Sequence, residues 1–309
     1  MSALLDIKDL RVTFNTRYGE VTALDSVSLH VNEGETLGVV GESGCGKSIT
    51  ALATMGLIPS PPGRIAGGSI ALNGEELTSA SEARLRALRG AEIAMIFQEP
   101  MTSLNPVFTV GAQIAEAIML HQKVSRDTAM KDAVALLDRV GIPSPAERAR
   151  DYPHQLSGGM RQRVMIAMAV SCRPKVLIAD EPTTALDVTV QAQIFDLLNE
   201  IQREFGAAII LITHDMGAIS EMADRVAVMY AGRVIEEASA DSVLDTPQHP
   251  YARGLIDCIP ALGKGDTALK EIPGVVPPLH LLGAGCAFAA RFAHANARCL
   301  SEKPQLINH

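Results

Sequence analysis

Residues 41–48 read Gly-Glu-Ser-Gly-Cys-Gly-Lys-Ser and come directly after the apolar stretch "ETLGVV" at 35–40. The apolar stretch predicts a buried strand, and "SITALATMGLI" at 48–58 has the spacing of a helix. Two glycines that flank four residues, followed by Lys and Ser, form the pattern of a phosphate-binding loop when they stand between a strand and a helix. Backbone N–H groups in such a loop point at one anion, and the helix adds its positive end. This stretch therefore predicts an α/β fold built around a phosphate site.

Within this loop, Lys47 would place its charge on the β- and γ-phosphates of a nucleotide, and the Ser48 hydroxyl would be a ligand of Mg²⁺. The loop residues that we expect to bind the nucleotide are Gly41, Glu42, Ser43, Gly44, Cys45, Gly46, Lys47, Ser48 and Ile49. The alternative is a chance glycine-rich turn between a strand and a helix. The complete motif makes that alternative the weaker one.

Two carboxylates follow a second apolar strand, "KVLIADEP" at 175–182. Asp180 could hold Mg²⁺ through water, and Glu181 could accept a proton from an attacking water. The alternative is an acidic helix cap after a strand. His214 in "LITHD" and Gln98 in "MIFQEP" also come at the ends of predicted strands, but each is equally consistent with a capping or core residue.

The rest of the chain supports the α/β class. The first forty residues alternate polar and apolar positions, as in "LRVTF" at 10–14, which is typical of antiparallel strands. "PSPPGRIAGG" at 59–68 predicts a break, and "SIALNGEEL" at 69–77 predicts a further strand and turn. Helical spacing dominates from about 101 to 170, and then strands alternate with helices, as expected of a parallel sheet. From about 241 onward the chain is rich in proline, glycine and histidine, so residues 241–309 are predicted to be a small extension of a domain at 1–240.

Composition and charge argue against several classes of protein. The 309 residues are 47% hydrophobic and 20% charged, which is ordinary for a globular protein. The net charge of −8 argues against nucleic acid as a partner. We find no apolar stretch of about 18 residues that would span a bilayer, and no secretory signal at the N-terminus. The five cysteines form no disulfide framework, and one lies in the phosphate loop, so a reducing cytoplasm fits best.

A second glycine turn, "QLSGGMRQR" at 155–163, opens onto a predicted helix and would form a second anion site. With this turn, six landmarks stand in one order along the chain: "GESGCGKS", Gln98, "LSGGM", "VLIADE", "ALD" at 185–187, and His214. Over residues 1 to about 240 the chain closely resembles the ATP-binding cassette (ABC) ATPases. That resemblance implies a nucleotide-binding domain with an N-terminal antiparallel β region and an inserted helical subdomain at about 101–170.

The resemblance also explains why one chain carries two cradles. In this family, two copies lie head to tail and enclose two ATP molecules, so that the signature of one copy contacts the nucleotide of the other. The residues that would act in trans are Leu156, Ser157, Gly158, Gly159 and Asp187. By the same resemblance Glu181 is the general base, His214 contacts the γ-phosphate, and Gln98 senses Mg²⁺ and phosphate. Tyr18 would stack on adenine, although it could equally be an exposed tyrosine at the end of a strand.

Further stretches resemble the ATPases of bacterial dipeptide and oligopeptide importers, a group that includes nickel importers. They are "FQEPMTSLNPVFTVGAQIAEAI" at 97–118 and "TPQHPYARGLIDCIP" at 246–260. This resemblance implies a peripheral protein at the cytoplasmic face of the inner membrane, with two permease subunits, a second ATPase that is identical or related, and indirectly a solute-binding protein. In that group the segment after Gln98 borders the groove where a permease helix docks, so Met101, Leu104 and Phe108 could be contacts or simply core residues. The alternatives are nickel or another small solute as cargo, and a soluble ABC ATPase that acts on DNA or ribosomes.

The C-terminal cysteines depart from the group's pattern. Importers of this group often carry four cysteines that hold an iron–sulfur cluster. Cys286 and Cys299 fit two of the places, Phe292 occupies another, and no fourth cysteine follows. Because a [4Fe–4S] cluster needs four ligands, usually thiolates, we expect a metal-free tail unless Cys258 or a histidine substitutes.

Overall fold

The computed structural model describes residues 3–99, 103–184, 186–258 and 271–307, which form two compact units. The first unit is mainly 79–212, with 31–36 and the start of the chain. The second unit comprises 5–30, 37–78 and 213–309. The predicted boundary at residue 240 follows the chain rather than these units, and it stays a prediction.

The first unit combines a parallel β layer with a group of helices. Its elements are α2 (Glu82–Leu88), β6 (Ile93–Ile96), α4 (Val110–Gln122), α5 (Arg126–Arg139), α6 (Pro145–Arg148), the 3₁₀ helix η1 (Pro153–Gln155), α7 (Gly158–Val170), β7 (Val176–Asp180), α8 (Val188–Phe205) and β8 (Ala208–Ile212). Strands β6, β7 and β8 are neighbours and parallel, with Ile96 opposite Ala179 and Asp180 opposite Ile212. Every residue of these three strands is buried, as expected of a parallel sheet covered on both faces.

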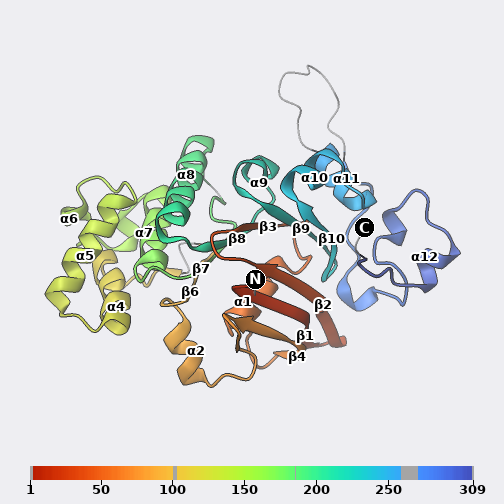
Figure 1. Ribbon diagram of the computed structural model, residues 1–309, viewed down its shortest axis with the longest axis horizontal. Coiled ribbons are helices and arrows are strands. Elements are labelled where there is room, and N and C mark those ends of the chain that lie inside the picture. The colour runs from red at the N-terminus through yellow and green to blue at the C-terminus, as the bar shows by residue number, and fades with distance from the viewer. Residues whose placement is uncertain (1–2, 100–102, 185, 259–270, 308–309) are drawn as a thin grey trace, which may run out of the picture. The chain divides into compact units, whose positions relative to one another are not determined.

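The helices of the first unit begin where the sequence provides caps. The hydroxyls of Thr109 and Ser125 accept backbone N–H bonds at the starts of α4 and α5. Helices α4, α5 and α7 lie side by side (Figure 1). The helical character predicted for 101–170 is therefore present in α4 to α7, of which α4 alone covers thirteen residues.

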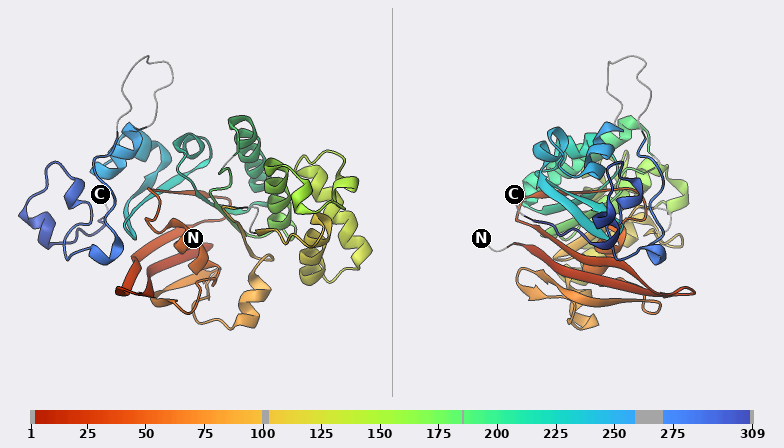
Figure 2. Two further views of the ribbon diagram at one scale, coloured as in Figure 1. Left: turned by 180° about the vertical axis from the view of Figure 1, so that it is seen from behind. Right: turned by 90° about the vertical axis from the view of Figure 1, so that its right-hand side faces the viewer.

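The second unit contains a four-stranded antiparallel sheet in the order β2-β1-β4-β5 and a separate set of strands around the phosphate loop (Figure 2). Its elements are β1 (Leu5–Thr16), β2 (Gly19–Val31), β3 (Thr36–Val40), α1 (Lys47–Thr54), β4 (Gly63–Leu72), β5 (Glu75–Glu76), α9 (Met216–Met222), β9 (Arg225–Tyr230), β10 (Arg233–Ser239), α10 (Ala240–Asp245), α11 (Pro250–Asp257), the 3₁₀ helices η2 (Leu279–Leu281) and η3 (Ala289–Arg291), and α12 (Ala297–Ser301). Strand β3 pairs with β9 in parallel, and β9 pairs with β10 antiparallel.

Two local predictions were wrong. The break predicted at 59–68 ends at Gly63, where β4 begins, because residues 63–67 pair with Phe14 to Arg11 of β1. Pairing with a long neighbouring strand outweighs the turn-forming tendency of the glycines. The helix predicted at 48–58 ends earlier, since α1 stops at Thr54 and Gly56 takes a positive φ of 62°.

Aromatic rings anchor the C-terminal extension within the second unit. Tyr251 of α11 lies 4.6 Å from Tyr230 of β9, and Phe288 lies 5.4 Å from Tyr230, measured between ring centroids. Tyr230 and Tyr251 are fully buried. Among the helices that the structure describes, none has the length and apolar character needed to cross a membrane.

Candidate functional site

The phosphate loop joins β3 to α1, as predicted. Gly41 has φ 150°, and a Cβ atom there would collide with the backbone oxygen of Met229. Gly46 has φ 111°, and a Cβ atom there would come 2.7 Å from the Leu24 side chain. Both the left-handed φ and the lack of space require glycine at these two positions. The loop is therefore fitted against β2 and β9.

Lys47 folds back over its own loop. Its Nζ donates hydrogen bonds to the backbone oxygens of Gly41 (2.6 Å) and Glu42 (3.2 Å). The side chain thus lies across the concave side of the loop, where a phosphate would replace the carbonyl oxygens as acceptors. Cys45 is buried beside it, and burial raises the pKa of the Cys45 thiol, while the charge of Lys47 opposes that rise.

The remaining loop residues differ in exposure. Ser43 and Gly44 are exposed, whereas Ser48 and Ile49, in the first turn of α1, are partly buried. The exposed tip and the helix start are the parts of such a loop that meet a phosphate.

Tyr18 lies in the turn between β1 and β2 and is 59% exposed. The Arg17 guanidinium donates to the Tyr18 hydroxyl at 2.6 Å, and the His280 ring stacks on the Tyr18 ring at 4.4 Å with an interplanar angle of 6°. A flat ring therefore already accepts a stacking partner from the C-terminal extension. Stacking on adenine remains a prediction for Tyr18.

The first unit brings two predicted catalytic residues together. Glu181 directly follows β7, and Gln98 follows the neighbouring strand β6. The Gln98 amide donates to Oε2 of Glu181 at 2.9 Å, and the Thr184 hydroxyl donates to the same oxygen at 3.0 Å. Glu181 has φ 47°, in the left-handed region that side chains rarely adopt. The strained turn and the two donors give the carboxylate a fixed direction.

Asp180, the last residue of β7, is buried. Its carboxylate, the Gln98 amide oxygen and the Ser48 hydroxyl are hard oxygen donors, the type that Mg²⁺ prefers. Asp180 and Gln98 belong to the first unit and Ser48 to the second. The donor chemistry of these three residues fits Mg²⁺.

The signature residues lie at the start of α7. Ser157 caps the helix by accepting a bond from the Met160 N–H at 3.3 Å, and Ser157 and Gly158 are exposed. Leu156 is buried and anchors the turn, while Gly159 is partly buried against Val190. An exposed helix start of this kind presents free backbone N–H groups, which are suited to binding an anion.

Asp187 and His214 are both exposed and lie at or near the start of a helix. Asp187 caps α8 by accepting a bond from the Val190 N–H at 3.0 Å, and it is exposed; its place at a dimer interface stays a prediction. His214 is exposed and lies two residues beyond β8, next to Asp215, which caps α9. Ala185 of the "ALD" motif lies outside the described residues.

Two residues near the phosphate loop were not predicted. The Tyr251 hydroxyl accepts the backbone N–H of Glu42 at 2.8 Å. The Arg291 guanidinium donates to both carboxylate oxygens of Glu42, at 2.6 and 3.1 Å. Tyr251 lies in the stretch at 246–260 that resembles the importer ATPases, but that resemblance does not point to Glu42. Both residues are more than two hundred positions from Glu42, so the sequence carries no local signal for these contacts.

The segment after Gln98 divides into core and surface. Leu104 is buried, which confirms the core alternative for that residue, whereas Phe108 is 53% exposed. Met101 lies outside the described residues. Phe108 therefore remains as a candidate contact for a partner.

Cys286 and Cys299 in the C-terminal extension are joined by a backbone hydrogen bond and not by a disulfide. The N–H of Cys286 donates to the backbone oxygen of Cys299 at 2.8 Å, and Cys258, Cys286 and Cys299 are free and partly buried. Over the residues that the structure describes, no group of three or more His, Cys, Asp or Glu side chains is arranged to hold a metal ion. The metal-free tail remains a prediction.

Two families of known proteins match parts of this chain. Residues 24–184 match the family described as ABC transporter, and residues 235–299 match the family described as oligopeptide/dipeptide transporter, C-terminal region. The chain is 53% identical to the oligopeptide transport ATP-binding protein OppD of Escherichia coli (strain K12), over 98% of this chain and 89% of that protein. It is 49% identical to the OppD protein of Bacillus subtilis (strain 168), over 99% and 86%.

Solved structures show the same fold. A dimeric ATP-binding cassette in a post-hydrolysis state, bound to ADP and Pi, superposes with a TM-score of 0.70 at 26% identity, covering 76% of this chain and 98% of that one. A protein of Clostridium perfringens, part of an ABC transporter complex, superposes with a TM-score of 0.65 at 29% identity, covering 79% and 91%. The predicted ABC-type α/β fold is therefore confirmed. With relatives about half identical over nearly its whole length, this chain belongs to the ABC transporter family, as an ATP-binding protein of that family.

Proposed function

We propose that this chain is the ATP-hydrolysing motor subunit of a bacterial importer for di- or oligopeptides. The observation that supports this most is the second family match, at 235–299, because that C-terminal region is named for oligopeptide and dipeptide transporters. Relatives with near-complete coverage are named oligopeptide or dipeptide transport ATP-binding proteins, including the dipeptide protein DppD of Escherichia coli (strain K12) at 50% identity.

In the proposed hydrolysis, Glu181 accepts a proton from the water that attacks the γ-phosphate. Gln98 and Thr184 donate to one oxygen of this carboxylate and so hold its direction. Lys47 exchanges its bonds to the loop carbonyls for bonds to the β- and γ-phosphates. His214 completes the contacts to the γ-phosphate.

Mg²⁺ would be held by Ser48, Gln98 and, through water, Asp180, and when bound it would neutralise phosphate charge. The chain's own contribution is to provide oxygen donors at the ends of β6 and β7 and at the start of α1. These roles are proposals that rest on donor chemistry and position in the chain.

The second cradle serves a second copy or a related ATPase. The exposed start of α7, with Ser157 and Gly158, would contact the γ-phosphate on the partner's loop, with Leu156, Gly159 and Asp187 beside it. We call this pair of ATPase subunits with ATP enclosed between them the sandwich. Its closure would exclude water and fix the attacking water molecule, so that ATP joins the two subunits. One of the structural neighbours is a cassette dimer with ADP and Pi, which supports this arrangement.

The subunit would act at the cytoplasmic face of the inner membrane, on two permease subunits that carry the spans. Closure of the sandwich would move the docked permease helices and switch the pathway between its two openings. A solute-binding protein would deliver peptide on the other side. Phe108, which is exposed four positions after the buried Leu104, is the apolar residue that we expect a permease helix to cover.

Affinity purification from detergent-solubilised native membranes, followed by mass spectrometry, tests the partners. We expect two multi-span permeases and a second cassette protein or a second copy. Phe108→Asp should lose the permeases, while Leu120→Asp, a matched exposed residue on α4, should keep them. Recovery of ribosomes or DNA-binding proteins alone would contradict a transport function, and permeases of a nickel importer would replace peptide with nickel as cargo.

A further inference from the structure

The C-terminal extension reaches the phosphate loop through a buried arginine. The Arg291 side chain, at the end of η3, is only 2% exposed. Its guanidinium donates to the Glu42 carboxylate at 2.6 and 3.1 Å and also to the backbone oxygens of Pro273 (2.9 Å) and Ile272 (3.2 Å). Hydrogen bonding to Glu42 raises the pKa of Arg291. A planar fork held on both sides in this way fixes the position of what it binds.

Glu42 is thereby held at two points. Its carboxylate pairs with Arg291, and its backbone N–H donates to the Tyr251 hydroxyl at 2.8 Å. Tyr251 is itself fully buried against Tyr230 and Phe288. Both anchors come from the part of the chain after residue 240, so the extension sets the conformation of the second residue of the loop.

The same contact controls charge at the loop. The backbone oxygen of Glu42 accepts a bond from Lys47 Nζ at 3.2 Å, so Glu42 lies beside the lysine that would meet the phosphates. A nucleoside triphosphate is strongly anionic, and an unpaired carboxylate at this position would repel it. Glu42 is one-third exposed, so water screens part of its charge, and Arg291 neutralises it directly.

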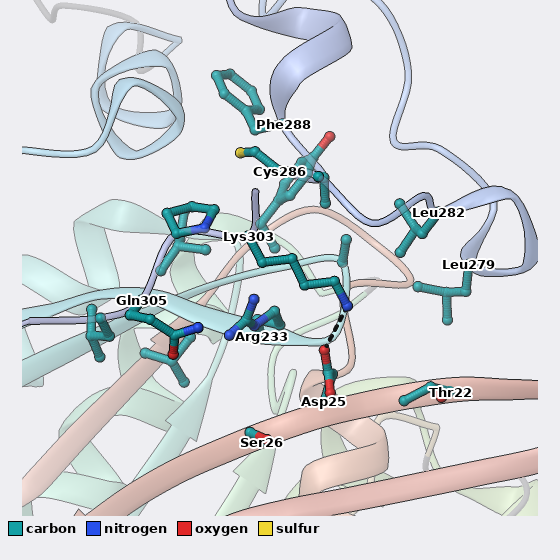
Figure 3. A pocket seen from close by; sticks show the side chains of 18 of the residues that line it. Thr22, Asp25, Ser26, Arg233, Leu279, Leu282, Cys286, Phe288, Lys303 and Gln305 are labelled. Atoms are coloured by element: carbon teal, nitrogen blue, oxygen red, sulfur yellow. Dashed lines mark hydrogen bonds and ion pairs between the residues drawn. The ribbon is translucent and has the colours of Figure 1, made fainter. Parts of the chain in front are cut away.

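The C-terminal extension also lines a cavity within the second unit. A cavity of about 620 Å³ is lined by β2, by β9 and β10, and by parts of the extension, including Asp25, Arg233, Phe288 and Lys303 (Figure 3). On one wall Lys303 pairs with Asp25 at 3.2 Å. Tyr230 and Phe288 line this cavity and also pack against Tyr251, so the cavity borders the aromatic cluster that anchors the extension.

We propose that Arg291 is a positioning residue of the phosphate loop, which holds and neutralises Glu42 and thereby strengthens nucleotide binding. The inference rests on the assignment of residues 41–48 as the ATP loop in the proposed function. It makes the C-terminal extension a part of the ATP site rather than an appendage to it. Loosening of the extension would lower affinity for ATP without touching any residue of the loop.

The test is a fluorescence titration of the purified full-length chain with MANT-ATP, together with thermal melts. Arg291→Gln should raise Kd about tenfold, because the carboxylate then lies unpaired beside the anion. Arg291→Lys, which keeps the charge but not the fork, should raise it only about threefold. Arg298→Gln is the matched control, since its pair with Glu302 is exposed, and it should leave Kd unchanged.

The Glu42→Gln background distinguishes a positioning role of Arg291 from a role in folding alone. In this background, Arg291→Gln should change Kd less than about twofold, because no unpaired charge remains. A merely structural role would lower the melting temperature and the number of binding sites per chain, with Kd of the folded fraction unchanged. That outcome, or equal Kd increases in both backgrounds, would overturn the proposal.

If Arg291→Gln does not fold, Arg291→Lys replaces it. Its effect on Kd is then compared between the wild-type and Glu42→Gln backgrounds, and equal increases in both would overturn the proposal. Wild-type protein that fails to bind MANT-ATP would contradict the ATP site itself. Wild-type binding with unaffected variants would contradict only the role of Arg291.

Discussion

The side-chain amide of Gln98 donates a hydrogen bond to the Glu181 carboxylate at 2.9 Å across 83 residues of chain. The contact follows from topology, because β6 and β7 are adjacent and parallel and both residues come at the carboxyl ends of their strands. Gln98, which by itself was equally consistent with a capping or core residue, thus forms a single unit with the predicted base Glu181.

Glu181→Gln should lower the rate of ATP hydrolysis on the order of 10²–10⁴-fold, because the amide cannot accept the proton of water. ATP binding should persist, so size-exclusion chromatography with Mg-ATP should show a trapped dimer. Glu200→Gln, an exposed residue of α8, serves as the control and should hydrolyse normally. A Glu181→Gln chain that elutes only as monomer would contradict the sandwich.

The Gly158→Ala substitution should impair the proposed second anion site without changing the stability of the fold. A Cβ atom at Gly158 meets no atom within 4 Å in one copy, so the melting temperature should stay within about 2 °C of wild type. In the closed dimer the same atom would crowd the partner's nucleotide, and the ATPase rate should fall at least about tenfold. Gly67→Ala, also in open space, is the matched control. Full activity of Gly158→Ala would remove this residue from the proposed site.

Tyr18→Ala should raise the Kd for ATP about tenfold, since stacking of a base on an aromatic ring contributes about 1–3 kcal/mol. Tyr18→Trp keeps a flat ring and should bind about as tightly as wild type. Isothermal titration calorimetry in the Glu181→Gln background measures both. Equal affinity of the alanine variant would leave Tyr18 only its contacts with Arg17 and His280.

The acid stability of the protein should depend on His249. Its Nδ1 accepts the Tyr251 N–H at 3.0 Å at the start of α11, and burial lowers the pKa of His249, although the nearby Glu236 opposes this. Because the folded pKa is depressed, the neutral ring stabilises the fold above about pH 6.5, and that contribution is lost as the pH falls through the folded pKa.

His249→Asn keeps a capping oxygen but cannot titrate, so its melting temperature should fall less than that of wild type between pH 7 and 5. The free-energy gap between the two proteins should change by at most about 1.4 kcal/mol per pH unit. His294→Asn, at an exposed histidine of the extension, should follow the wild-type curve. Parallel curves for wild type and His249→Asn would exclude this titration as a cause of acid sensitivity.

The purified protein should be colourless. Only Cys286 and Cys299 fit the cluster positions, and Phe292 stands where a third cysteine would be needed. An absorption spectrum from 350 to 500 nm checks this, with an anaerobically prepared sample as the control against loss of a labile cluster. A brown anaerobic sample that absorbs near 400 nm would show that Cys258 or a histidine completes the ligand set.

Much of the site could be predicted because its motifs are local. The phosphate loop, the capped start of α7 and the carboxylates at the end of β7 are each set by a few adjacent residues whose backbone tendencies agree. Residues 63–68 were not predictable in the same way, because their strand depends on pairing with β1. The same applies to Arg291 and Tyr251, which reach Glu42 only through tertiary packing.

The decisive measurement for peptide import is ATP-driven uptake by the purified complex in proteoliposomes. We expect radiolabelled di- or oligopeptide to accumulate only with solute-binding protein and ATP, and Glu181→Gln to abolish accumulation while the permeases stay bound. ATP hydrolysis with no peptide uptake, or accumulation of nickel in its place, would contradict the peptide-import function.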